Sequence, residues 1–164
     1  PNTGSEHFQF KLIESILNWE AIFMNERPII IHDLNDAMIA ISIASQLESQ
    51  VTLKNAPGTA NFFGPQVFKE IVEQAKAKYK RASVRAIFDC GEDVGMALRA
   101  LRHGVKLIRI KAPRETLKKI SSIATKLQAQ IDLPQSTLSE GTLSSLNLLD
   151  LDDAEGAIKN WLND

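Results

Sequence analysis

The stretch 84-VRAIFDCGEDVGMALRALRHGVKLIRI-110 decides the fold class, because it reads as a strand, a helix and a strand in one short run. Its two ends, 84–88 and 105–110, are apolar and rich in β-branched residues, as short buried strands are. Between them, 92–103 carries apolar residues at helical spacing, and Gly104 is well placed to end that helix. Two strands joined through a helix by short links predict a βαβ unit and therefore a parallel sheet.

The same alternation continues on both sides of this unit. Strand-length apolar runs precede it at 28-PIIIH-32 and 50-QVTLK-54, and a brief fifth strand is expected at 130-QIDL-133. Amphipathic or strongly apolar segments of helix length lie between and after the strands: 35–49, 65–82 and 113–129. We therefore predict an α/β fold, a three-layer α/β/α sandwich that is flavodoxin-like or similar, with a small, mostly parallel sheet of four to five strands.

The chain is expected to form a single α/β domain over 1–164, because its length is that of one ordinary domain and no long low-complexity linker divides it. The core is placed at about 28–133, after an amphipathic helix at about 11–24. A Leu-rich segment and a last helix follow within 134–164.

Composition argues against several classes of function. The formal net charge of −1 does not fit a general nucleic-acid-binding surface, which would be basic. Cys90 is the one cysteine, which excludes a disulfide framework and favours a cytoplasmic setting. No apolar run approaches the roughly 20 residues that cross a bilayer, so no membrane partner is expected.

A ligand site is expected at the C-terminal ends of the strands, where ligands bind in open parallel sheets. Four segments should meet at this edge: 32–36, 55–64, 89–93 and 111–113. They supply the candidate ligand-binding residues His32, Asn55, Gly58, Thr59, Asp89 and Lys111. This expectation follows from the fold and not from a chemical motif.

Familiar catalytic and phosphate-binding motifs are absent. In 55-NAPGTANFFGPQVF-68, the spacing of Gly58 and Gly64 does not fit a P-loop, and the chain has no G-x-G-x-x-G and no G-x-S-x-G. For this loop a turn that closes the core with Phe62 and Phe63 is preferred. A protein contact and an anion contact at the helix start remain alternatives.

The cluster 89-DCGED-93 allows two interpretations. Capping of the following helix by its carboxylates is preferred, since acids suit a helix N-terminus. The alternative is a Mg²⁺ site in which Asp33 or Asp36 joins the acids of this cluster, with Asp33 and Asp89 as the candidate ligands, and no other cofactor is expected. Cys90 is interpreted as a buried, inert thiol, because the neighbouring carboxylates raise its pKa.

The run A-L-R-A-L-R-H-G-V-K-L-I-R-I-K-A-P, which ends at 113, resembles the last third of a response-regulator receiver domain. The resemblance implies a flavodoxin-like fold, with Lys111 in the place of the receiver lysine and Asp33 matching a first-strand acid. Asp89 then falls where receivers have Ser or Thr, and 54-KNAPG-58 stands where the phosphoacceptor would be. The resemblance is therefore one of fold, and any receiver function would be that of a degenerate receiver.

A second resemblance covers about residues 28–113. Its P-G-x-A-x-x-x-G loop, and the DCG that precedes A-L-R-x-G-V, are similar to those of small bacterial α/β proteins of uncharacterised function. This resemblance implies no site residue.

The preferred functional interpretation is a non-catalytic binding or regulatory domain of unknown specificity. Its candidate partners are another protein, a second copy of the chain, or a small anionic ligand. The alternative is a small enzyme acting on a phosphorylated or carboxylated metabolite, with or without Mg²⁺, in which Lys111 binds the anion and Asp33 or Asp89 is the general base. Convergence of these three side chains on one pocket would favour the enzyme.

Overall fold

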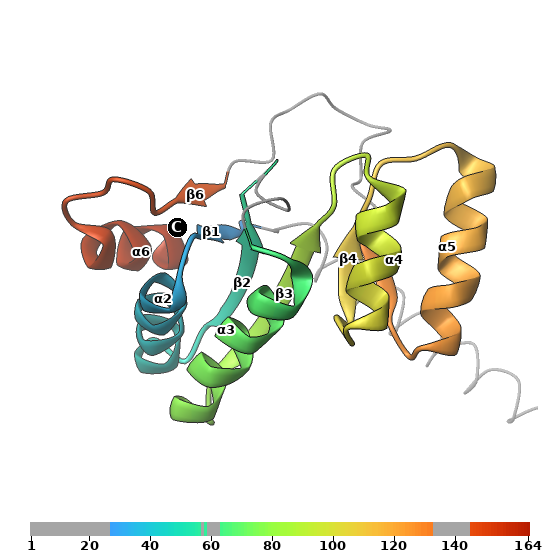
Figure 1. Ribbon diagram of the computed structural model, residues 1–164. Coiled ribbons are helices and arrows are strands. Elements are labelled where there is room, and N and C mark those ends of the chain that lie inside the picture. The colour runs from blue at the N-terminus through green and yellow to red at the C-terminus, as the bar shows by residue number, and fades with distance from the viewer. Residues whose placement is uncertain (1–26, 57, 59–62, 133–144) are drawn as a thin grey trace, which may run out of the picture.

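The computed structural model describes residues 27–56, 58, 63–132 and 145–164. Strands and helices alternate as far as β5, after which β6 and α6 follow: β1 (Ile29–Ile31), α2 (Leu34–Gln46), β2 (Gln50–Asn55), α3 (Pro65–Lys78), β3 (Ser83–Asp89), α4 (Val94–Arg102), β4 (Leu107–Arg109), α5 (Arg114–Lys126), β5 (Gln130–Asp132), β6 (Leu146–Asn147) and α6 (Ala154–Asn163). The described strands form one parallel sheet in the order β5-β4-β3-β2-β1-β6 (Figure 1). The predicted α/β fold with a parallel sheet is confirmed, although the sheet has six strands instead of four to five.

The sixth strand, β6, comes from the Leu-rich segment and was not predicted. It pairs with β1 through hydrogen bonds from the backbone N–H of Leu146 to the Pro28 carbonyl (3.0 Å) and from Leu148 to Ile30 (3.3 Å). A strand of two residues has no periodicity that a sequence pattern could reveal. The helix expected at about 11–24 and residues 133–144 lie outside the described residues.

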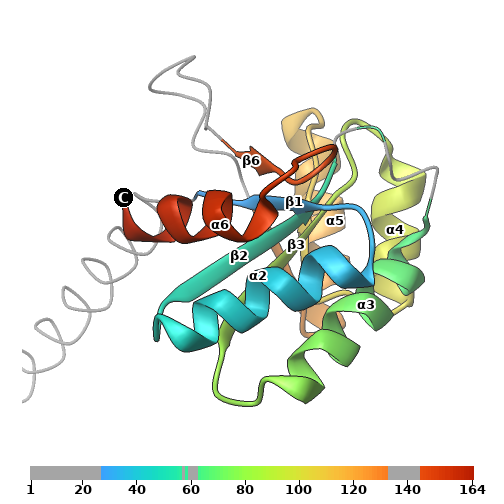
Figure 2. The same ribbon diagram turned by 90° about the vertical axis from the view of Figure 1, so that its left-hand side faces the viewer.

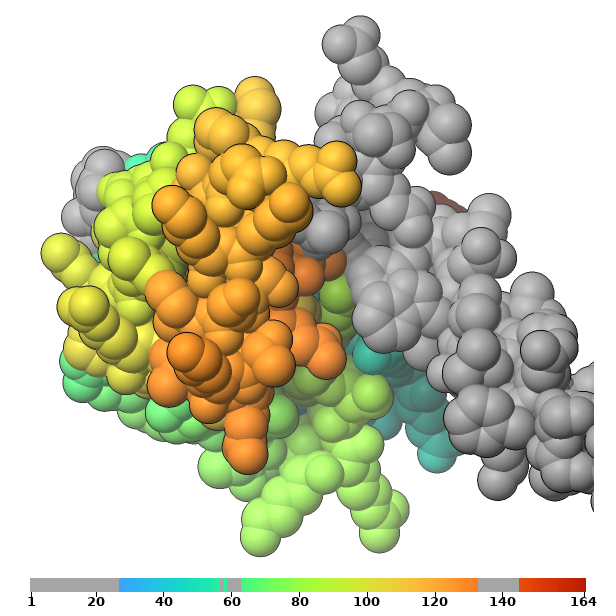
Figure 3. Space-filling model, turned by 90° about the vertical axis from the view of Figure 1, so that its right-hand side faces the viewer, coloured from blue at the N-terminus to red at the C-terminus, as the bar shows by residue number. Residues whose placement is uncertain are grey.

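The described helices lie side by side in the order α6-α2-α3-α4-α5, which follows the order of the strands (Figures 1 and 2). Right-handed crossovers that always step toward the same edge of a sheet place their helices on the same face. These helices therefore form one layer, which ends at α5, with α4 next to it (Figure 3). A three-layer sandwich is consistent with this arrangement, because the described helices supply one of its two outer layers.

The hydrophobic core lies between the sheet and this helix layer. Alternate strand residues point toward the helices, among them Phe88 of β3, whose ring packs against that of Phe68 of α3 with 5.4 Å between centroids. The residues between them point to the opposite face of the sheet, which we call the second face. It carries both apolar and charged side chains: Ile30, Lys54, Arg85, Ile87, Asp89, Arg109 and Asp132.

Candidate functional site

The three residues considered as a catalytic group are engaged separately. Asp33 is the N-cap of α2 and accepts a hydrogen bond from a backbone N–H of the first turn (2.8 Å). Lys111 forms a surface ion pair with Glu92 (3.2 Å), and its side chain is 83% exposed. Asp89 lies on the second face of the sheet. No contact joins Asp33, Asp89 and Lys111, all of which are described residues, so their convergence is not observed.

His32 links the C-terminal end of β1 to β6. Its ring Nε2 lies 2.7 Å from Oδ1 of Asn147, and its backbone N–H donates to the Asp36 carboxylate at 2.8 Å. Burial raises the pKa of Asp36, and the neighbouring charge of Asp33 adds to this, whereas the hydrogen bond from His32 lowers the same pKa. His32 therefore has a structural role in holding β6 on the sheet.

The loop that follows β2 is described only in part. Gly58 adopts a positive φ of 80°, which suits glycine, and among the described residues nothing lies within 4 Å of the place that a Cβ would take. Phe63 packs against the hydrophobic core, which confirms the expected closure of the core for this residue. Thr59 and Phe62 lie outside the described residues.

The side chain of Asn55 continues the hydrogen bonding between β2 and β3 beyond the last pair of residues that are joined through their backbones. Its Nδ2 donates to the Asp89 carbonyl at 3.0 Å, and its Oδ1 accepts from the Asp89 backbone N–H at 2.6 Å. Its side chain is fully buried. Asn55, predicted as a ligand-binding residue, therefore positions Asp89.

The acidic cluster after β3 serves local structure. Asp93 caps α4 by accepting from the backbone N–H of Met96 (2.9 Å), which confirms the capping interpretation for this residue. Oδ1 of Asp89 accepts from the backbone N–H of Gly91 (2.9 Å), whose φ is +58°. Within the described part of the chain, no three His, Cys, Asp or Glu side chains are grouped so that they could hold a metal ion.

Cys90 is buried, as predicted. Burial, and after it the charges of Asp89 and Asp93, raise the pKa of its thiol to about 12. Because the folded pKa lies above that of an unfolded chain, the thiol stabilises the folded state fully below about pH 9, and this contribution is lost as the pH rises toward 12.

We expect Cys90 in the native protein to react with a chromogenic disulfide at pH 8 at least about a hundredfold more slowly than in the urea-unfolded chain, since the thiolate is the reactive form. The measurement is the rate of thiolate release in both states, with free cysteine in the same urea as the control. Equal rates in the native and unfolded states would contradict the inert interpretation.

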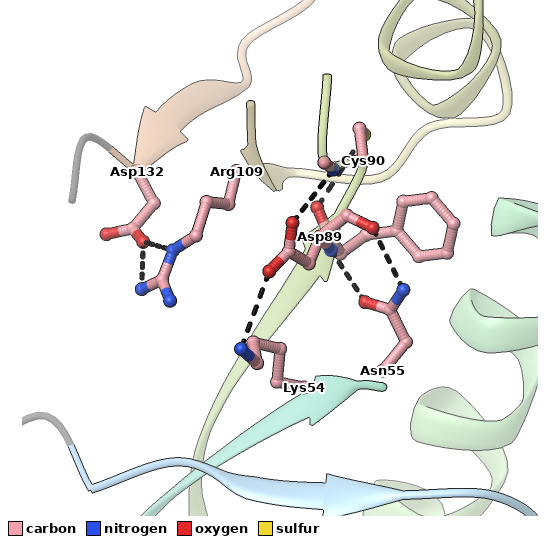
Figure 4. A network of polar contacts seen from close by, with 8 residues as sticks. Lys54, Asn55, Asp89, Cys90, Arg109 and Asp132 are labelled. Atoms are coloured by element: carbon pink, nitrogen blue, oxygen red, sulfur yellow. Dashed lines mark hydrogen bonds and ion pairs between the residues drawn. The ribbon is translucent and has the colours of Figure 1, made fainter. Parts of the chain in front are cut away.

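Five charged side chains from four adjacent strands meet on the second face, and we call them the charged cluster: Lys54, Arg85, Asp89, Arg109 and Asp132. Asp89, Arg109 and Asp132 are register partners across β3, β4 and β5, so they form a row across the sheet. Figure 4 shows Asp132 beside Arg109 and Lys54 beside Asp89. Asp89 is the one member that the sequence had indicated as a site residue.

One half of the cluster is a carboxylate held between two guanidinium groups. Oδ1 of Asp132 accepts from Nη2 of Arg85 at 3.1 Å, and its Oδ2 accepts from Nε of Arg109 at 2.7 Å and also contacts Nη2 of that arginine. The side chain of Asp132 is 1% exposed, and both arginines are largely buried. Charge-assisted bonds of this kind satisfy Asp132 on both oxygens.

The other half is the pair of Lys54 and Asp89. The Lys54 side chain is 10% exposed, and its Nζ lies 3.4 Å from Oδ2 of Asp89. An ammonium has three N–H donors, and 3.4 Å is longer than a usual N–H···O hydrogen bond. Asp89 is the one partner of Nζ among the described residues, so this buried ammonium keeps donors that those residues do not satisfy.

Four members of the cluster were missed from the sequence, although a signal for three of them was present. Arg85 and Arg109 interrupt strands that are otherwise mainly apolar, and Lys54 stands in a strand that alternates polar and apolar residues, whereas strands buried on both faces read as continuous apolar runs. This signal indicates that one face of the sheet is polar. It does not show which charged side chains contact one another, because those contacts depend on the register of the strands.

Neither a model of a known protein family nor a curated protein matches the sequence. The chemistry of the site has to be derived from its own geometry. Within the described ranges, no helix is both long and apolar enough to cross a membrane.

Proposed function

We propose that this chain is a cytoplasmic binding domain of bacterial, flavodoxin-like type that holds a small anionic ligand beside Lys54 on the second face of the sheet. The observation that supports this proposal is that the described residues leave the hydrogen bonding of the buried Nζ incomplete. A carboxylate or phosphate oxygen would accept the hydrogen bonds that Asp89 leaves open, and charge-assisted bonds of this type are strong.

Stability alone does not account for the charges of the cluster. Removing an ion from water costs several kcal/mol, and well-packed apolar residues in place of a buried ion pair are often neutral or stabilising. A binding role gives these side chains a function. All but Arg85 lie in the last two positions of their strands, close to the edge at which open parallel sheets bind their ligands. The second face is therefore a better candidate for the site than the separately engaged Asp33 and Lys111.

A small enzyme acting on a phosphorylated or carboxylated metabolite is the second candidate. The observation in its favour is an amine next to a carboxylate, Lys54 beside Asp89, since such a pair can exchange a proton during a reaction. The contacts of Lys111 do not support its expected role as the anion-binding residue of such an enzyme. Lys111 pairs with Glu92 at the surface.

Thermal unfolding in the presence of anions tests the binding site. Inorganic phosphate, pyruvate and glycerol 3-phosphate are added separately, with sodium chloride holding the ionic strength constant. At about 100 times its dissociation constant, an anion that binds the folded state should stabilise it by about 2.7 kcal/mol and raise the midpoint by roughly 5–11 °C. Lys54→Met should abolish the shift.

The matched control is Lys119→Met, which removes an exposed ammonium of α5 and should keep the shift. A shift that persists in Lys54→Met would place the anion elsewhere. No shift of the wild type with any of the three anions would refute the proposed binding function.

A further inference from the structure

We infer that Lys54 is an amine nucleophile that forms a Schiff base with a small aldehyde or ketone carrying a carboxylate or phosphate group. This inference rests on the binding site proposed above and names its substrate class. The reason is the combination of a buried lysine amine and an adjacent carboxylate on the second face. Lysines with limited access to water are the ones used for Schiff-base chemistry.

The first requirement is a base for the ammonium proton, because only the neutral amine attacks a carbonyl carbon. Oδ2 of Asp89 lies 3.4 Å from Nζ, and catalytic hydrogen bonds are often this long before a substrate is bound. No other carboxylate among the described residues contacts Nζ. Asp89 is therefore the group that would take the proton.

The second requirement is that this carboxylate be held in place. The Asn55 side chain fixes the backbone of Asp89 through two hydrogen bonds, and the backbone N–H of Gly91 donates to Oδ1 of the carboxylate. These contacts leave Oδ2 directed to Lys54, as Figure 4 shows. An acid–base group that is locked in this way does not have to reorient during proton transfer.

The step balances without an oxidant or a reductant. Asp89 takes one proton from the ammonium, and the amine nitrogen then forms a bond to the carbonyl carbon. The carbinolamine oxygen leaves as water with the proton from Asp89 and a second proton from the nitrogen. In sum, the ammonium and the carbonyl compound give a protonated imine and one water.

The charge of the surroundings favours an anionic substrate. Arg109 is the register neighbour of Asp89 on β4, and Arg85 lies two positions from Ile87, the register partner of Lys54. The charged cluster therefore places three cations and two carboxylates on one face. Cations that line one surface raise the local concentration of anionic ligands. A carbonyl compound without a charged group should therefore react more slowly than pyruvate.

Reductive trapping tests this inference. The full chain is incubated with pyruvate or with dihydroxyacetone phosphate and cyanoborohydride, and the products are analysed by intact mass and peptide mapping. We expect one adduct per chain, on the peptide that contains Lys54. Lys54→Arg should lower the yield at least about tenfold, Asp89→Asn should slow its formation by a similar factor, and Lys119→Arg should change neither.

Lactate, which has the carboxylate of pyruvate but no carbonyl group, separates this inference from the proposed function. Suppose that lactate stabilises the wild type in thermal unfolding but neither carbonyl compound forms an adduct. This result would refute the Schiff base and still support the binding site. Neither stabilisation nor an adduct would refute both. The role of Lys54 would also be refuted if adducts formed on many surface lysines and their yield were unchanged in Lys54→Arg. This comparison of wild type with Lys54→Arg does not require Asp89→Asn to be stable.

Discussion

Replacing Asp132 with asparagine should lower the free energy of unfolding by about 3–5 kcal/mol, the usual cost of breaking a buried ion pair from one side. The carboxylate is almost completely buried and accepts hydrogen bonds from both Arg85 and Arg109. Asparagine keeps the size of the side chain but removes its charge, so the two largely buried guanidinium groups would lose the counter-charge that they share. The measurement is urea unfolding followed by circular dichroism at neutral pH.

Asp164→Asn is the matched control for this experiment. Asp164 approaches Arg27 at 3.9 Å, and its side chain is 76% exposed, so the same substitution should change the free energy of unfolding by no more than about 0.5 kcal/mol. A cost below about 1 kcal/mol for Asp132→Asn would mean that this carboxylate is not the main source of stabilisation for the two arginines.

The α/β architecture could be predicted because it is a property of local sequence. Short apolar runs indicate the strands of the core, and apolar residues at helical spacing indicate the helices. The helix α4 is also followed by a stop signal, Gly104, whose φ is +82°. The position of β6 could not be predicted in this way. Its pairing with β1 depends on contacts between residues more than 100 positions apart, such as His32 with Asn147.

The candidate site could be placed at one edge of the fold, but its members could not be identified. Asp89 was recognised because it follows a strand, whereas its partner Lys54 lies 35 positions earlier and meets it only through the register of β2 and β3. Polar residues that follow a strand can bind a ligand, but they can also cap the next helix, as Asp33 does for α2. Spacing along the chain does not distinguish these two roles, because capping and ligand binding use the same side chains.

Replacing Asn55 with leucine should lower the free energy of unfolding by about 2–4 kcal/mol, because it leaves two backbone groups of Asp89 without their partners. Asn55 is fully buried and bonds both the N–H and the carbonyl of that residue, at 2.6 Å and 3.0 Å. Leucine has the same branched arrangement of four side-chain heavy atoms but bulkier methyl groups, so the cost would come from lost hydrogen bonds and tighter packing and not from a cavity. Urea unfolding gives the change in stability, and amide hydrogen exchange gives its location.

The amide proton of Asp89 is the specific reporter in this experiment. In Asn55→Leu it should lose at least about tenfold in protection, whereas amides of the β1–β2 pairing, such as Leu53, should follow only the change in global stability. Asn35→Leu, an exposed position in the first turn of α2, should leave both measurements close to wild type. Full protection of the Asp89 amide in Asn55→Leu would show that the side chain of Asn55 does not hold this residue. In that case the fixed orientation of the Asp89 carboxylate toward Lys54 would have to come from Gly91 alone.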